Sequence, residues 1–150
     1  MLPHHRWNLE TLVTMFKLIA SLFVVSLFVC STANAFVVVN PKVIDGDTID
    51  TGIVVEGLPN IHARVSGIDT PELHNYHCSQ ELLLARKAKE FTSNFIKGKS
   101  VIITPIKWDK YGGRLVAVVM VDDVELGAEL LKNGLAHPFT GQGKKQSWCQ

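Results

Sequence analysis

One corner of the chain decides its fold, and it reads Arg64-Val65-Ser66-Gly67-Ile68-Asp69-Thr70-Pro71-Glu72. Pro71 has no backbone N–H to donate, and it pushes Thr70 toward an extended conformation. A strand that enters the corner must therefore end there, with the carboxylates of Asp69 and Glu72 presented from a stiff turn. Because Arg64 precedes Asp69 by five residues, a guanidinium and a carboxylate leave the same strand close together.

Five stretches rich in Val and Ile, separated by turn-forming residues, are typical of strands. The predicted strands are 36–44, 48–55, 61–68, 101–106 and 115–121.

Two helices are predicted among these strands. The first has Ser79 as its N-cap and Gly98 as its C-terminal signal, and the second spans residues 126–133. The order is three strands, a helix, two strands and a short helix. This order predicts an α+β, mainly β fold, with a five-stranded OB-fold barrel and one helix between strands three and four.

The N-terminal part of the chain has the order of a secretory signal. An apolar run, residues 18–29, follows Lys17 and precedes Ala33-Asn34-Ala35. This order is typical of a signal that is cleaved at an A-x-A site, here before Phe36. The run is shorter than the ~20 residues that a membrane-spanning helix needs.

We therefore expect residues 1–35 to be a signal peptide, with residues 1–14 as an upstream extension before a second start at Met15. Residues 36–150 would then form one domain, exported to the periplasm or secreted, without stable membrane association. An uncleaved signal that anchors the chain in a membrane is the alternative.

The two cysteines that follow the signal agree with export. Cys78 and Cys149 form an even pair, which in an oxidising compartment predicts a disulfide. An alternative is a zinc site formed by these cysteines with His74 and His77, although their spacing matches no common zinc site.

The charge balance limits how the domain can bind a polyanion. Residues 36–150 contain thirteen basic and thirteen acidic residues, so their net charge is zero. Proteins that cover a long duplex usually carry a basic surplus. A nucleic acid must therefore be held locally, and Lys144 and Lys145 are interpreted as solvated tail residues or phosphate contacts.

Charged side chains from separate segments form the candidate site, namely Asp47, Arg64, Asp69, Glu72 and Arg114. Carboxylates together with a backbone carbonyl at Thr70 make an oxygen shell that suits Ca²⁺ better than zinc. Two arginines offer planar, bidentate donors for the oxygens of a phosphodiester. A carboxylate that the metal does not need can orient or deprotonate water. This set predicts phosphodiester cleavage.

These residues resemble the thermonuclease, or staphylococcal nuclease-like, family of calcium-dependent nucleases. The resemblance rests on Ile44-Asp45-Gly46-Asp47-Thr48, Arg64 with Ile68-Asp69-Thr70-Pro71-Glu72, Asp109-Lys110-Tyr111-Gly112 with Arg114, and Asn133-Gly134-Leu135-Ala136. All of these segments in order are highly specific, and the resemblance implies a five-stranded OB barrel. The chain departs from the family pattern in one extra glycine before Arg114 and in the absence of a long C-terminal helix, which a Cys78–Cys149 bridge would replace.

The resemblance also implies roles for the site residues. Asp47, Asp69 and the Thr70 carbonyl would bind Ca²⁺, and Glu72 would be the general base. The two arginines, Arg64 and Arg114, would neutralise transition-state charge, whereas Lys110 and Tyr111 would hold the neighbouring phosphate.

The function implied is hydrolysis of DNA, and of RNA as a second substrate, by a monomer that leaves 3′-phosphate ends. The alternative is an OB-fold nucleic-acid-binding module that lacks catalysis.

Overall fold

The computed structural model describes residues 10, 13, 34–57, 60–110 and 112–149. The chain divides into two units, residues 1–32 and residues 33–150, and the following description concerns the second unit. The predicted signal peptide lies largely outside the described residues. A search of the described helices finds none that is both long enough and apolar enough to span a membrane.

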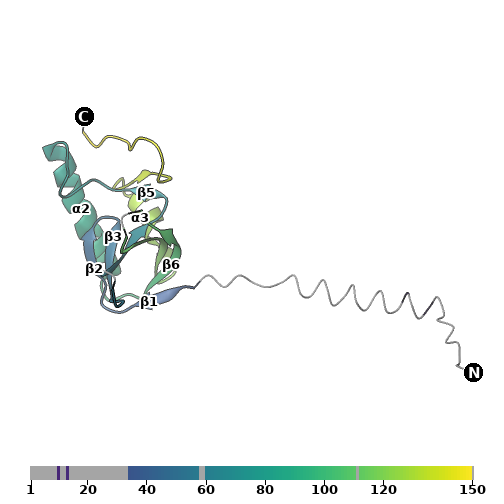
Figure 1. Cartoon of the computed structure of the whole chain (residues 1–150). Helices are drawn as coiled ribbons and strands as arrows, with labels where there is room; N and C mark the ends of the chain where they lie inside the picture. Colours follow the sequence, from purple (N-terminus) through teal and green to yellow (C-terminus); the bar gives the residue numbers. More distant parts are fainter. Residues whose placement is uncertain (1–9, 11–12, 14–33, 58–59, 111, 150) are drawn as a thin grey trace, which may run out of the picture. The chain divides into compact units, whose positions relative to one another are not determined.

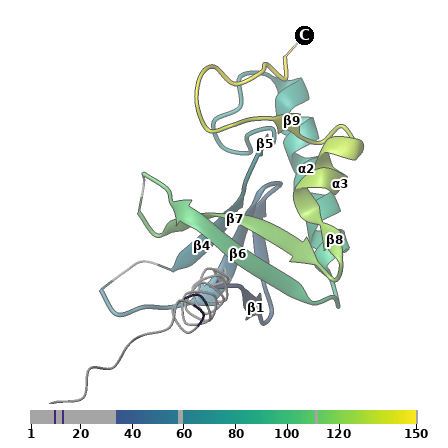
Figure 2. The ribbon, with the colours of Figure 1, turned by 90° about the vertical axis from the view of Figure 1, so that its right-hand side faces the viewer.

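A strongly curled sheet forms the centre of the second unit (Figures 1 and 2). Its strands run in the order β1 (Phe36–Val38), β6 (Val101–Trp108), β7 (Arg114–Val121), β4 (Ile61–Val65), β3 (Thr48–Ile53) and β2 (Lys42–Asp45), and β8 (Val124–Glu125) pairs with β7. Neighbouring strands are antiparallel except β4 and β7, which are parallel. The parallel pair brings two distant parts of the chain together at the centre of the sheet.

Two helices and a small second sheet complete the unit. Helix α2 (Ser79–Ile96) connects the first strands to β6, and α3 (Leu126–Lys132) follows β8. The two-stranded sheet joins β5 (Ile68–Asp69) to β9 (His137–Pro138). The chain is therefore a mixed α+β fold with a curled sheet and two helices.

The five predicted strands are all present, but two of them are interrupted. The first is divided at Asn40, which has a positive φ of 54° immediately before Pro41, so β1 and β2 are separate strands. The third is divided at Gly67, whose φ of 78° turns the chain between β4 and β5. The described residues therefore contain more strands than the five that were predicted. The residue patterns did not reveal the bends that divide two of them.

The core lies between the sheet and the helices. Fully buried side chains from both include Ile49, Val65, Ile103, Val119 and Leu130. Along β4 and β7 the buried residues alternate with less buried ones, so one face of this strand pair contacts the core and the other faces outward. The outward face carries both arginines of the candidate site.

Candidate active site

The turn between β2 and β3 fixes Asp47 by packing tightly on α2. A Cβ atom added to Gly46 would lie 2.7 Å from the Cβ of Ala88, and the Thr92 hydroxyl donates a 2.7 Å hydrogen bond to the Gly46 carbonyl. The Asp47 side chain is consequently buried, and it accepts hydrogen bonds from the Thr48 hydroxyl (3.1 Å) and the Thr70 backbone N–H (3.3 Å).

Arg64 joins the two buried carboxylates. It lies on β4 opposite Thr48, and its Nη2 is 3.2 Å from Asp47 Oδ2 and 3.1 Å from Asp69 Oδ1. Burial lowers the pKa of Arg64, but the two carboxylates outweigh that effect and raise it above its usual value. Burial raises the pKa of Asp47 to about 7, with Arg64 opposing the shift and the nearby Asp45 adding to it. Burial away from water is therefore the largest influence on the pKa of Asp47.

The strand ends at the corner, as the sequence predicted, because β5 stops at Asp69. Asp69, Thr70 and Pro71 are buried, whereas the side chain of Glu72 is 41% exposed. Buried Glu81, in the first turn of α2, accepts hydrogen bonds from the backbone N–H groups of His77 (2.7 Å) and Glu72 (3.4 Å). The loop that carries Glu72 is thus attached to the start of the helix.

Arg114 is oriented by a carboxylate across its own hairpin. Asp109 Oδ2 accepts a 2.7 Å hydrogen bond from Arg114 Nε and also pairs with Nη2, and the Asp109 backbone N–H donates to the Arg114 carbonyl at 2.8 Å. Burial raises the pKa of Asp109, but the hydrogen bond and charge of Arg114 outweigh it, and the net result is a lowered pKa. Lys110 lies in the same turn, while Tyr111 lies outside the described residues.

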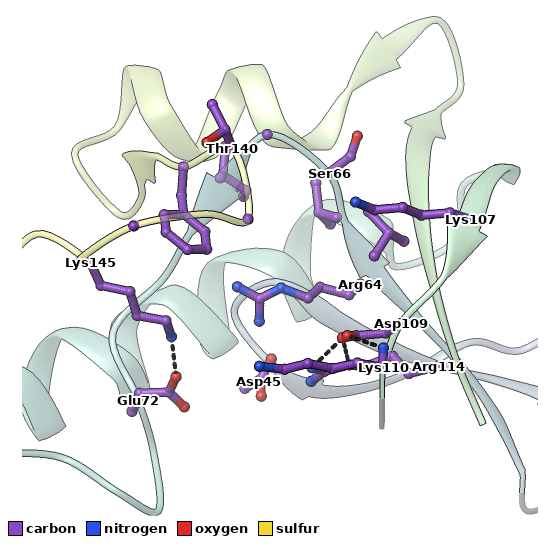
Figure 3. Close-up of a pocket in the computed structure, with 17 residues that line it drawn as sticks. Asp45, Arg64, Ser66, Glu72, Lys107, Asp109, Lys110, Arg114, Thr140 and Lys145 are labelled. Carbon is purple, nitrogen blue, oxygen red and sulfur yellow. Dashed lines mark hydrogen bonds and ion pairs between the residues drawn. The ribbon is translucent and has the colours of Figure 1, made fainter. Parts of the chain in front are cut away.

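A cavity of about 500 Å³ brings these groups together (Figure 3). Arg64 on β4, Glu72 in the loop after β5 and Arg114 on β7 all line it. Its five basic residues are Arg64, Lys107, Lys110, Arg114 and Lys145, and its three acidic residues are Asp45, Glu72 and Asp109. The cavity therefore has a basic surplus although the domain as a whole has none.

Lys145 connects this cavity to a second one of about 420 Å³. Lys145 and Glu72 line both cavities, and Asp69 lines the second. The ammonium group of Lys145 lies 2.8 Å from Asp69 Oδ1 and 2.7 Å from Glu72 Oε1. Its interpretation as a solvated tail residue was therefore wrong, because the tail folds back onto the acidic corner.

The donors at the acidic corner have the chemistry that a hard divalent cation requires. The carboxylates of Asp47 and Asp69 both reach one guanidinium nitrogen. Within the described residues, one buried oxygen of Asp45 accepts no hydrogen bond, so an additional anionic oxygen is available. Two cationic side chains contact these acids, and the described residues contain no group of three His, Cys, Asp or Glu side chains arranged to hold a metal ion. Carboxylate oxygens are the ligand type that a hard divalent cation takes, and in this structure Arg64 and Lys145 contact them.

The predicted disulfide is confirmed, and the zinc alternative is wrong. Cys78 and Cys149 are bonded to each other, so neither sulfur is a thiolate ligand. The bond attaches the C-terminal tail to the residue that precedes α2. Next to it, the rings of His137 and Trp148 stack with their centroids 3.6 Å apart.

Sequence reasoning brought the main site residues together but missed three partners. Glu81 was not assigned to the site, Asp109 was recognised only as part of a motif, and Lys145 was interpreted only as a solvated tail residue or a phosphate contact. For Asp109, the sequence did contain a signal. Asp109 and Arg114 are five residues apart across a predicted turn, a spacing that can place the two side chains beside each other on paired strands. For Lys145, nothing in the local sequence indicates its partners.

Comparison with known proteins gives consistent matches. Residues 62–148 match the model of the staphylococcal nuclease homologue family, a range that includes Arg64 and Arg114 but begins after Asp47. A probable endonuclease of Schizosaccharomyces pombe is 38% identical over 88 residues, which cover 54% of this chain and 37% of that protein.

Two further relatives match comparable parts of the chain. An uncharacterized protein of Methanocaldococcus jannaschii is 33% identical over 121 residues (65% of this chain, 56% of that protein). A probable endonuclease of Debaryomyces hansenii is 28% identical over 93 residues (57% and 39%). The matched segments thus span from 37% to 56% of the lengths of these relatives. The family model covers more than half of the sequence, and the matched range includes Arg64 and Arg114, which line the 500 Å³ cavity. The chain therefore belongs to the family of staphylococcal nuclease homologues.

Proposed function

We propose that this chain is a calcium-dependent nuclease that hydrolyses phosphodiester bonds of DNA and RNA and leaves 3′-phosphate ends. One observation carries the proposal: Arg64 and Arg114, from two strands, and Glu72, from a loop, line a single basic cavity. Two relatives that are named probable endonucleases add support.

The two arginines supply fixed donors for a phosphate. Arg64 and Arg114 lie on the adjacent parallel strands β4 and β7, where His62 pairs with Arg114 and Arg64 pairs with Val116. Residues paired in this way share a face of the sheet, so both guanidinium groups approach the cavity from the same side. In the proposed reaction they bind the non-bridging oxygens and stabilise the charge that grows on them.

Glu72 is the proposed general base. Its half-exposed carboxylate lines the cavity, so water can reach it, and the hydrogen bond to Glu81 holds its backbone. The carboxylate takes a proton from a water molecule that attacks the phosphorus. Asp47, Asp69 and the Thr70 carbonyl are the proposed ligands of Ca²⁺, which when bound supplies Lewis-acid polarisation of a phosphoryl oxygen.

Substrate binding is proposed to be local rather than spread over the surface. The basic cavity of a domain with no net charge can hold a phosphodiester without coating a long duplex. Lys110 lines the cavity and is proposed to contact the neighbouring phosphate. The same role for Tyr111 stays a prediction.

The barrel type, the location of the protein and its oligomeric state form part of the same proposal. We assign the curled sheet to an OB-type barrel, and we infer export to the periplasm or the medium, after signal cleavage, as a monomer. The bonded pair Cys78–Cys149 favours an oxidising compartment.

A digestion assay tests the proposed function. The full-length chain, expressed with its signal sequence, is incubated with linear DNA and with RNA in calcium chloride or in EDTA, and product ends are identified. We expect cleavage only with calcium, and we expect Glu72→Gln to lose at least about 100-fold in rate. Glu90→Gln is the matched control, since the exposed side chain of Glu90, in helix α2, makes no ion pair or hydrogen bond within the described part of the chain. Undiminished cleavage in EDTA would overturn the metal assignment, and binding without cleavage would favour the inactive binding module.

A further inference from the structure

The ammonium group of Lys145 occupies the position between two carboxylates of the proposed metal site. Its Nζ is 2.8 Å from Asp69 Oδ1 and 2.7 Å from Glu72 Oε1. Asp69 Oδ1 also accepts a 3.1 Å hydrogen bond from Arg64 Nη2. One oxygen of a proposed calcium ligand therefore already contacts two cationic side chains.

The fold holds this ammonium group in place. The tail is fixed before Lys145 by the pairing of β9 with β5 and by the 2.9 Å hydrogen bond from the Phe139 N–H to the Gly67 carbonyl. It is fixed after Lys145 by the Cys78–Cys149 disulfide. A lysine side chain has an ordinary pKa of about 10.4, so this one carries a positive charge at neutral pH.

We propose that Lys145 is a tethered counter-cation that neutralises the Asp69–Glu72 pair in the metal-free protein and must leave Asp69 before calcium binds there. This inference rests on the proposed function. An ammonium group and a divalent cation repel each other strongly at contact distance, so they cannot share one oxygen. The 500 Å³ cavity, which Lys145 also lines, receives the displaced side chain next to the proposed phosphate position. Calcium binding would thus move Lys145 toward the phosphate, where it would add a third positive charge to those of Arg64 and Arg114.

Calorimetric titration of the full-length exported protein with calcium chloride tests this exchange. We expect Lys145→Gln to bind calcium about five- to tenfold more tightly than the unaltered protein, because one of the two cationic side chains on Asp69 no longer has to be displaced. Lys144→Gln is the control, since it makes the same change in net charge one residue away. Lys144 makes no ion pair within the residues that the structure describes. An equal effect of both substitutions, or unchanged or weaker binding by Lys145→Gln, would overturn the proposal.

The disulfide provides a second, independent measurement. Replacing Cys78 and Cys149 by Ser releases the tail, so we expect tighter calcium binding in the otherwise unaltered protein and no further gain in the Lys145→Gln background. Circular dichroism checks that each variant is folded. Additive gains from the two changes would mean that the tether does not act through Lys145, which would contradict the proposal.

Failure of this inference differs from failure of the proposed function. If the unaltered protein cleaves DNA with calcium but Lys145→Gln binds calcium no more tightly, Lys145 is not the counter-cation and the nuclease proposal stands. If Lys145→Gln binds calcium more tightly but no variant cleaves a nucleic acid, the exchange stands and the nuclease proposal fails. If neither protein binds calcium, the exchange is also rejected.

Discussion

At the residue scale, the candidate site depends on how each arginine is held. Arg64 contacts two buried carboxylates, and Arg114 contacts one carboxylate from its own hairpin. An arginine with its fork fixed in this way can donate two parallel hydrogen bonds to a phosphate, which a lysine cannot do.

Replacing Arg114 by Lys tests this geometry. The positive charge is kept and the fork is lost, so under the proposed function we expect the turnover number to fall about 100-fold, with little change in calcium affinity. Single-turnover kinetics and calorimetry measure the two quantities. Parallel losses of turnover, calcium affinity and folding would contradict the role that we assign to Arg114.

Replacing Asp109 by Asn tests the lowered pKa of that carboxyl group. A folded-state pKa below the unfolded value, about 3.9, means that ionised Asp109 stabilises the fold above that pH. This stabilisation is lost as the pH falls through the folded-state pKa. We therefore expect Asp109→Asn to reduce the free energy of unfolding at pH 7 and pH 5, and the difference to shrink toward zero in more acidic solution.

Urea unfolding at several pH values measures this difference. Asp123→Asn is the control, because Asp123 is exposed and makes no hydrogen bond within the described residues. A difference that stays constant from neutral to strongly acidic pH would show that the carboxylate charge is not the cause.

At the scale of single elements, the turn between β2 and β3 positions Asp47 because it contacts α2. The added Cβ of Gly46→Ala would meet Ala88 Cβ at 2.7 Å, and Thr70 Cβ at 3.1 Å. We expect this substitution to destabilise the protein by about 1–3 kcal/mol, as measured by urea unfolding. The further substitution Ala88→Gly should reduce the cost of Gly46→Ala. An equal cost in both backgrounds would rule out the contact as the cause.

The elements also show what the sequence could and could not predict. The helix between the third and fourth predicted strands is confirmed. Its N-cap is Cys78 and not the predicted Ser79, and no side chain of the described residues caps its first turn. The breaks at Asn40 and Gly67 were missed, because each is a single residue with positive φ inside an apolar run. Helix α2 buries Ala85, Ala88, Thr92 and Ile96 most deeply, whereas Phe91 and Phe95 pack only partly against the core.

At the scale of the whole molecule, the disulfide closes a long loop. Cys78 and Cys149 are 71 residues apart, and in the chain-entropy model a loop of this length is worth about 4 kcal/mol. We expect the double replacement by Ala to reduce the free energy of unfolding by about 2–4 kcal/mol. Urea unfolding under non-reducing conditions measures the change, and full stability without the bond would contradict it.

The site as a whole was predictable only where the motifs are local. The corner at Asp69–Glu72 and the two arginines follow from short segments. Glu72, Arg64 and Arg114 line one cavity, whereas Asp69 contacts only Arg64 of the two arginines, within the described residues. The contact of Lys145 with Asp69 and Glu72 joins residues more than 70 positions apart. It depends on the path of the tail, which carries no periodic pattern from which that path could be predicted.

The parallel pairing of β4 with β7 has a practical consequence for protein engineering. The separation of the two arginines is set by the backbone ladder, and the Asp109–Arg114 hydrogen bond closes the hairpin, so the number of residues at Gly112–Gly113 does not set it. A short peptide grafted between these glycines, such as an affinity tag or a dye-labelling sequence, should leave the spacing of Arg64 and Arg114 intact.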